Sequence, residues 1–242
     1  PRDDLLFAEL ARHAGPMSVI VGGIEEGDDH AQYIASFLIE GDGVKHVHRK
    51  VYLASYGVFD EARYVGAGRH VRCADTRFGR VGMVVCEDAW HPSLVGITLL
   101  QGADLLTIQV ASPVRDLRRG ELPRNAEIWL DTLRTYARLY GTYILFCNRV
   151  GSEDGLVFWG HSCVLGPGGE TVGVGQAQAD RHAPAEDVLV VRGREEGVRR
   201  VGRVDEAGGG VIGSEAPSSE LLDVVRELEV AGGDGELDPV LQ

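Results

Sequence analysis

The sequence has few cysteines, no excess of positive charge and no long apolar run. Its four cysteines are dispersed over 242 residues without a CxxC pair, which argues against a disulfide scaffold and leaves a reducing, cytoplasmic compartment as the default. A formal net charge of −13 argues against a sequence-independent nucleic-acid binder and gives no reason to expect an anionic membrane as partner. No apolar run reaches the ~18 residues of a membrane-spanning helix.

Motifs for cofactors and metal ions are also lacking. The glycine-rich stretch 166–169 is not followed by Lys-Ser or Lys-Thr, so it is not a phosphate-binding loop. Residues 208–210 lack the preceding strand of a dinucleotide-binding fingerprint, and His46 and His48 have no third metal ligand nearby in sequence. We therefore expect no cofactor and no metal site.

Apolar periodicity and turn signals predict a mixed order of helices and strands. The predicted helices span residues 5–15, 91–101 and 126–140. The predicted strands span residues 19–21, 32–40, 44–48, 71–74, 80–85, 105–110, 142–147, 162–165, 171–174 and 188–191. This alternation of helices, strands and hairpins favours an α/β sandwich with sheets inside and helices outside.

The character of the chain changes after residue 191. Residues 195–210 are charged and rich in glycine, which is typical of a linker. Residues 218–228 carry an apolar stripe at helical spacing, and the tail from Gly232 is expected to be mobile. We predict one catalytic domain over residues 1–191, followed by a C-terminal extension over residues 192–242.

Cys86 is the most informative single residue. It ends the apolar run 81–85, which predicts a buried strand, and a polar stretch with Pro92 follows, which predicts a turn and a helix start. A thiol at such a strand end lies near free backbone N–H groups, which can lower its pKa and bind an oxyanion. The alternative is a small core residue, as most free cysteines are.

Three motifs around Cys86 carry a family resemblance. They are HRKVYL at 48–53, YGVFDEARY at 56–64 and GMVVCEDAWHPSL at 82–94, and a later block at 148–170 agrees with them. Together they resemble the nitrilase (carbon-nitrogen hydrolase) superfamily, and YGVFDEARY looks most like the glutaminase domain of glutamine-dependent NAD synthetases. The resemblance runs from residue 1 to 191 and implies a single-domain, nitrilase-like α-β-β-α sandwich whose N-terminal strand is missing.

The resemblance also implies roles for individual residues. Cys86 is the nucleophile that forms a thioester, and Lys50 with the backbone N–H of Glu87 holds the oxyanion. Glu61 orients the Lys50 ammonium, and Tyr56 lines the substrate pocket. The alternatives are a surface lysine, a salt bridge of Glu61 with Arg63 or Arg49, and simple packing of Tyr56.

Ser112 and the general base stand outside these motifs. Ser112 follows a predicted strand and could reach the pocket from its end. The family's general-base glutamate lies at the end of the first strand, which the resemblance places ahead of Pro1. Glu9 is a poor substitute because it falls within the predicted helix 5–15. Since the chain starts at Pro1 and not Met, we expect either that a segment ahead of Pro1 carries the base or that this protein lacks it.

The combined prediction is a thiol amidohydrolase that releases ammonia from a small carboxamide, with glutamine or a related ω-amide favoured. Nothing after residue 191 resembles an ATP-pyrophosphatase domain, so we expect a free-standing hydrolase or a glutaminase subunit that passes ammonia to a partner enzyme. A non-catalytic regulatory or scaffold protein and an N-acyltransferase remain alternatives, and a nitrile substrate stays open. The family's habit of pairing implies a homodimer or larger homo-oligomer.

Overall fold

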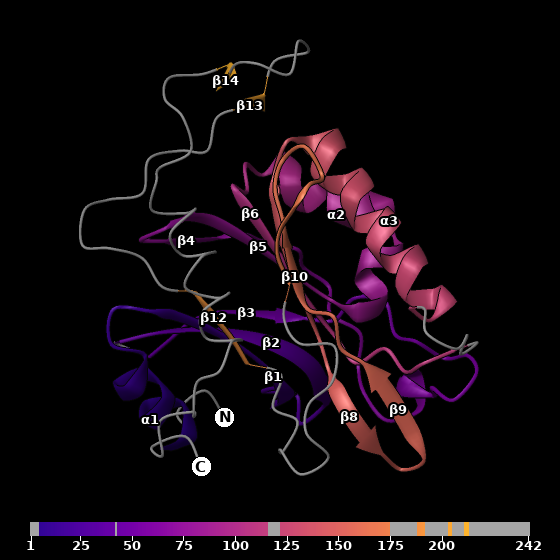
Figure 1. Cartoon of the computed structure of the whole chain (residues 1–242). Helices are drawn as coiled ribbons and strands as arrows, with labels where there is room; N and C mark the ends of the chain where they lie inside the picture. Colours follow the sequence, from indigo (N-terminus) through magenta and orange to yellow (C-terminus); the bar gives the residue numbers. More distant parts are fainter. Residues whose placement is uncertain are drawn as a thin grey trace.

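Two β-sheets lie face to face in the centre of the molecule, with helices on their outer faces (Figure 1). The computed structural model describes residues 5–41, 43–115, 122–174, 188–191, 203–204 and 211–212. The layers follow the order helix, sheet, sheet, helix. The predicted α-β-β-α sandwich is therefore confirmed.

The first sheet is antiparallel, in the strand order β12-β1-β2-β3. Its strands are β1 (Ser18–Glu26), β2 (Gln32–Glu40), β3 (Gly43–Arg49) and β12 (Val188–Val191). The predicted hairpin at residues 32–48 is confirmed, and Gly43 takes a φ of +116° in its turn, which suits glycine. Strand β1 is longer than predicted because Gly22 and Gly23, read as its end, pair with Ser36 and Ala35.

The second sheet is mixed, in the order β11-β10-β7-β6-β5-β4. The parallel centre consists of β5 (Gly79–Val85), β6 (Leu105–Val110) and β7 (Tyr143–Asn148). The antiparallel flanks are β4 (Ala74–Thr76), β10 (Cys163–Leu165) and β11 (Thr171–Val174). The parallel connections run through α2 (Pro92–Leu100) and α3 (Arg124–Tyr140), as crossovers between parallel strands require.

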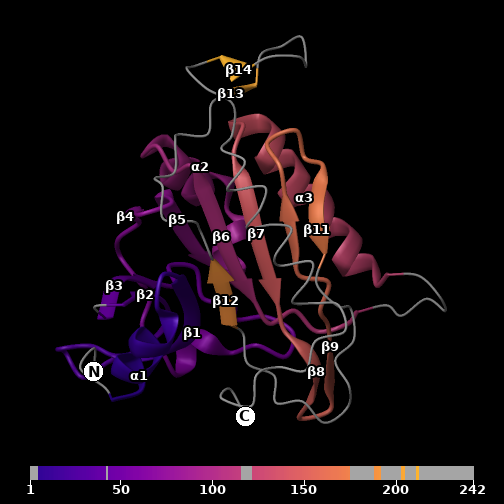
Figure 2. The same ribbon diagram turned by 60° about the vertical axis from the view of Figure 1, so that its left-hand side comes forward.

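Alternating side chains divide the apolar core into three layers. Ile20 and Leu38 face the second sheet, where they pack with Met83 and other residues between the sheets. Their neighbours Val19 and Phe37 face the opposite way, against α1 (Leu5–Ala14). Helices α2 and α3 cover the far side of the second sheet (Figure 2). Each fully buried side chain of this kind contributes about 1.5–3 kcal/mol.

A polar contact crosses the layer between the sheets. The Ser36 hydroxyl donates to Gln109 Oε1 over 2.5 Å, and Gln109 Nε2 donates to the Ile20 carbonyl over 3.2 Å. Both side chains are buried, so the loss of either partner would leave an unsatisfied polar atom. This contact joins the two sheets across the apolar layer between them.

Besides the longer β1, the structure differs from the predicted elements at β4 and at residues 150–159. Residues 71–73 are not a strand, and β4 begins only at Ala74. An unpredicted hairpin joins β8 (Val150–Glu153) to β9 (Leu156–Trp159). Its signal was the Asp154-Gly155 pair, and both residues adopt positive φ, as a two-residue hairpin turn requires.

Most of the predicted C-terminal extension lies outside the described residues, and so does the helix predicted at 218–228. Two short strands of this region are described, β13 (Arg203–Val204) and β14 (Val211–Ile212), which pair with each other. None of the helices in the described ranges has the length and apolar character needed to cross a membrane.

Candidate active site

Cys86 occupies a strained turn at the end of β5. It is the first residue of the 3-10 helix η2 (Cys86–Trp90), and its φ of +46° lies in the left-handed region that non-glycine residues rarely adopt. Such a conformation costs about 1–3 kcal/mol and persists only where the surroundings hold it. The parallel strand end and the turn together present the thiol at one edge of the second sheet.

The Asp88 carboxylate helps to fix the strained Cys86 turn through hydrogen bonds. The side chain is completely buried, and one oxygen accepts from the Val85 backbone N–H over 3.2 Å and from His48 Nε2 over 2.9 Å. The other oxygen accepts from the backbone N–H groups of Val51 and Tyr52, over 3.0 and 2.8 Å. Asp88 therefore ties the Cys86 turn to the chain on both sides of Lys50.

Neither Asp88 nor His48 was selected from the sequence as a site residue. The available signal was an acidic residue directly after the Cys-Glu pair, next to an apolar run, where a carboxylate needs partners. His48 was considered only as a metal ligand, together with His46. The structure separates the two, because His46 Nε2 donates to the Arg72 carbonyl over 3.1 Å while His48 bonds to Asp88.

Lys50 and Glu61 form a buried ion pair. Lys50 is 1% exposed, and its ammonium donates to both oxygens of Glu61, each over 2.7 Å. Glu61 begins the 3-10 helix η1 (Glu61–Arg63), and its Oε2 also accepts from the Ala54 backbone N–H over 2.7 Å. Lys50 is thus not a surface lysine, and the carboxylate of Glu61 pairs with it and not with Arg63 or Arg49.

A cavity of about 240 Å³ opens at Cys86. Tyr56 and Ser112, both selected from the sequence, line it together with the thiol. Ser112 is fixed from two sides, because its backbone N–H donates to Asn148 Oδ1 over 2.9 Å and its hydroxyl accepts from Asn125 Nδ2 over 3.2 Å. The remaining lining residues are Phe59, Trp90, Ala111, Pro113, Arg115, Asn125, Ile128 and Trp129.

The Glu87 side chain lies beside this cavity without lining it. Its Oε2 accepts the Tyr56 hydroxyl over 2.5 Å, and burial together with this hydrogen bond raises the pKa of Tyr56. Tyr56 therefore remains a neutral phenol at physiological pH, held over the cavity by Glu87. The backbone N–H of Glu87 follows the thiol directly, where an oxyanion donor is needed.

The environment of the thiol favours its neutral form. Burial raises the pKa of Cys86 to about 11; the Lys50 ammonium works in the opposite direction, while Glu61 and Glu87 add to the increase. The backbone N–H groups near the strand end thus do not lower the pKa below that of a free thiol, because desolvation outweighs them. Cys86 needs a proton acceptor before it can act as a nucleophile at neutral pH.

No carboxylate among the described residues hydrogen-bonds to the Cys86 thiol. Glu9 lies on α1, where its exposed side chain approaches Arg12 at 3.8 Å, so it is not a base for this site. The described ranges also contain no group of three or more His, Cys, Asp or Glu side chains placed to hold a metal ion.

Known proteins share both the sequence pattern and the fold of this chain. The profile of the carbon-nitrogen hydrolase family matches residues 5–191. The glutamine-dependent NAD(+) synthetase of Thermotoga maritima is 32% identical over 172 residues, which is 70% of this chain and 28% of that protein. The chain therefore spans less than a third of the length of this relative.

Two solved structures share the fold. The carbon-nitrogen hydrolase from Helicobacter pylori G27 superposes with a TM-score of 0.66 at 24% identity, over 76% of this chain and 65% of that one. An amidase from Nesterenkonia sp., with the acetamide moiety of fluoroacetamide added covalently at its active-site cysteine, superposes with a TM-score of 0.61 at 22% identity, over 77% and 65% of the two chains. With a family profile matched over more than half of its length, the chain belongs to the carbon-nitrogen hydrolase family.

Proposed function

We propose that this chain is a thiol amidohydrolase that releases ammonia from a small carboxamide through a thioester at Cys86. The observation that carries the proposal is the juxtaposition of a cysteine in a strained strand-end turn with a buried, carboxylate-held lysine. The thiol faces a cavity of about 240 Å³, which suits a small substrate. The active-site cysteine of the Nesterenkonia amidase supports the assignment of Cys86 as nucleophile.

The first half of the reaction forms the thioester. Once a base has taken its proton, the Cys86 sulfur attacks the carboxamide carbon and forms a C–S bond. Charge then develops on the carbonyl oxygen, and the Lys50 ammonium and the Glu87 backbone N–H stabilise it. The C–N bond breaks, the leaving nitrogen takes up a proton, and ammonia departs.

The second half returns the free thiol. Water gives a proton to the base and attacks the thioester carbon, and a second oxyanion forms at the same donors. The C–S bond then breaks, which yields a carboxylic acid and the protonated thiol. The Lys50 ammonium serves both halves, because Glu61 holds its positive charge in place before each oxyanion forms.

Glutamine or a related ω-amide is the substrate that we favour. The relative from Thermotoga maritima is named for its dependence on glutamine, and its match to this chain covers 172 residues. If the substrate is glutamine, the ammonia can pass to a partner enzyme. A homo-oligomer is likewise proposed, and light scattering at micromolar concentration would contradict it by giving the monomer mass.

A non-catalytic role on the same fold has one observation in its favour. The pKa of Cys86 is raised to about 11, and no carboxylate in the described part of the chain accepts its proton. A protein in this state would hold a small amide in the cavity without turning it over.

The deciding experiment measures ammonia release from glutamine, asparagine and short aliphatic amides, with hydroxylamine added to trap an acyl-enzyme as a hydroxamate. Turnover that disappears in Cys86→Ala and persists in Cys73→Ala is the expected result, since Cys73 does not line the cavity. Ammonia release that survives Cys86→Ala would overturn the mechanism. Binding of amides without ammonia or hydroxamate would favour the non-catalytic role, and preferential trapping by amines would favour acyl transfer.

A further inference from the structure

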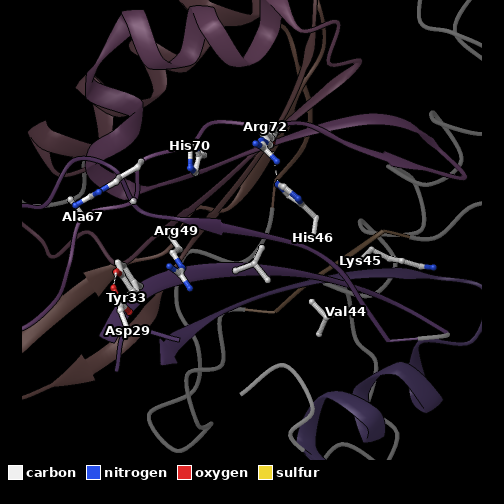
Figure 3. A pocket seen from close by; sticks show the side chains of 12 residues that line it. Asp29, Tyr33, Val44, Lys45, His46, Arg49, Ala67, His70 and Arg72 are labelled. Atoms are coloured by element: carbon white, nitrogen blue, oxygen red, sulfur yellow. Dashed lines mark hydrogen bonds between the residues drawn. The ribbon is translucent and has the colours of Figure 1, made fainter. Parts of the chain in front are cut away.

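A second hollow lies on the other side of the strand end that carries Lys50. It is a groove of about 560 Å³ between β3 and the segment 67–72, and Figure 3 shows its side chains. Cys86 is not among its lining residues. The groove is therefore separate from the candidate active site, although Arg49 in its wall directly precedes Lys50.

The groove concentrates positive charge in an acidic protein. Its lining includes four permanently cationic side chains and two imidazoles against the single carboxylate of Asp29. The chain as a whole has a formal net charge of −13. The six basic residues are Lys45, His46, Arg49, Arg69, His70 and Arg72. Such a local reversal of sign attracts anions.

The cations of the groove differ in their partners. Arg49 donates to Glu25 over 2.5 Å and lies over the Tyr33 ring, while Asp29 accepts the Tyr33 hydroxyl over 2.6 Å. Arg69 lies within electrostatic range of Tyr33, yet neither the Arg69 nor the Arg72 guanidinium has a hydrogen bond or ion pair with any residue that the structure describes. The charge of these two arginines therefore remains available to a ligand.

The backbone around these arginines is held in place. The Gly68 N–H donates to the Lys50 carbonyl over 2.7 Å, and a Cβ at Gly68 would come within 2.2 Å of the Arg49 carbonyl oxygen. Only glycine permits this close approach of the 67–72 segment to the end of β3. The Arg72 carbonyl accepts from His46, which fixes the far end of the same segment. The arginines are thus presented from a preorganised wall.

We propose that this groove binds a small anion with two linked phosphate groups, held by Arg69, His70 and Arg72. Guanidinium groups donate in pairs to phosphate oxygens, and such charge-assisted hydrogen bonds are stronger than neutral ones. A volume of about 560 Å³ exceeds what a single phosphate would fill.

The test is isothermal titration of the full chain with inorganic pyrophosphate at constant ionic strength, with sulfate titrated in parallel. Saturable pyrophosphate binding is expected, and Arg69→Gln/Arg72→Gln should weaken it by about tenfold or more, because both guanidinium groups that donate to the phosphate oxygens are lost. The matched control Arg12→Gln/Arg77→Gln removes the same charge outside the groove and should change the affinity by less than about twofold.

Absence of saturable binding would overturn the proposal. So would equal weakening by the two double variants, or equal binding of sulfate, since both would indicate general charge screening. If the groove variant does not fold, hydrogen exchange of the unaltered chain decides. Pyrophosphate should then slow exchange at residues 44–49 and 67–72, and unchanged exchange there would refute the site. None of these outcomes depends on amidase activity.

Discussion

Arg49 and Lys50 are adjacent in sequence, and they serve opposite sides of the same strand end. Lys50 is 1% exposed and donates to both oxygens of Glu61, within electrostatic range of Cys86. Arg49 is partly exposed, pairs with Glu25 and lines the groove that Arg69 and Arg72 complete. Successive residues of an extended chain point to opposite faces, so one residue step separates two electrostatic environments.

The contrast shows what burial does to a cation. A lysine removed from water is tolerated only with a partner in good geometry, and the partner then fixes its position. Arginines at a surface keep their hydration and need no partner, so they remain available to a ligand. In the two proposals, the same type of charge is a positioned catalytic group on one side and a ligand-binding group on the other.

The largest effect is expected from Lys50→Met. Loss of an oxyanion donor should lower kcat/KM for amide turnover by roughly 10²–10³-fold. Arg49→Met, the matched change on the groove side, should lower it by less than about threefold, because Arg49 faces away from the cavity. Steady-state ammonia release measures both. A similar loss of kcat/KM in the two variants would contradict the distinction between the Lys50 side and the Arg49 side of the strand end.

The next effect is expected from Asp88→Asn. An amide of the same shape cannot accept all four of the hydrogen bonds that Asp88 receives, so buried donors lose their acceptor. The free energy of unfolding should fall by about 3 kcal/mol, and kcat should fall with it because the Cys86 turn is released. Urea unfolding and single-turnover kinetics test this. Asp104→Asn, remote from the cavity, is the control, and an equal loss of kcat there would contradict the positioning role.

Glu61→Gln addresses the ion pair itself. The Lys50 ammonium would remain buried without a counter-charge, so stability should fall by about 3 kcal/mol. Asp29→Asn on the groove side should leave the melting temperature unchanged, because the Asp29 carboxylate is exposed to solvent. Thermal and urea unfolding of the two variants make the comparison. A stable Glu61→Gln protein would mean that the pair contributes little to the fold.

The smallest effect concerns the pH dependence of Cys86. Its pKa is about 11, so the thiolate fraction and the rate of alkylation by iodoacetamide should still rise about tenfold per pH unit near pH 9 to 10. A free thiol of pKa ~8.5 would level off there. Lys50→Met removes a cation that lowers the pKa, so the profile should move to higher pH, while Arg49→Met should leave it in place. Peptide mass spectrometry reads the labelling, and a plateau near pH 8.5 would contradict the burial of the thiol.

Much of the fold could be predicted because local patterns and tertiary contacts agree. The apolar spacing of residues 126–140 predicts the helix that is observed at Arg124–Tyr140, with Gly141 in the left-handed conformation at its end. The Gly41–Gly43 turn marks the β2–β3 hairpin in the same way. The hairpin β8–β9 escaped prediction although Asp154-Gly155 was its signal, because its short strands were read as part of a motif.

The candidate site likewise has residues that the sequence predicted and contacts that only the structure shows. The motifs identified Cys86, Lys50 and Glu61, because the type and order of these residues carry the resemblance. Which partner Glu61 takes, and whether Lys50 is buried, depended on contacts across 11 residues of chain. Asp88 and His48 lie 40 residues apart, so no local pattern revealed their bond.

By itself the sequence determined the layer order and the family and singled out Cys86 as the candidate nucleophile, since these rest on periodicity and on short motifs that are local in the chain. Only the tertiary structure decided the raised pKa of Cys86, the bond network of Asp88 and the separation of Arg49 from Lys50. Each of these depends on burial and on distances between segments remote in sequence. Desolvation and Coulomb energies depend on burial and on the distances between charges. Both are set by the packing of the two sheets, so they cannot be predicted from the order of residues alone.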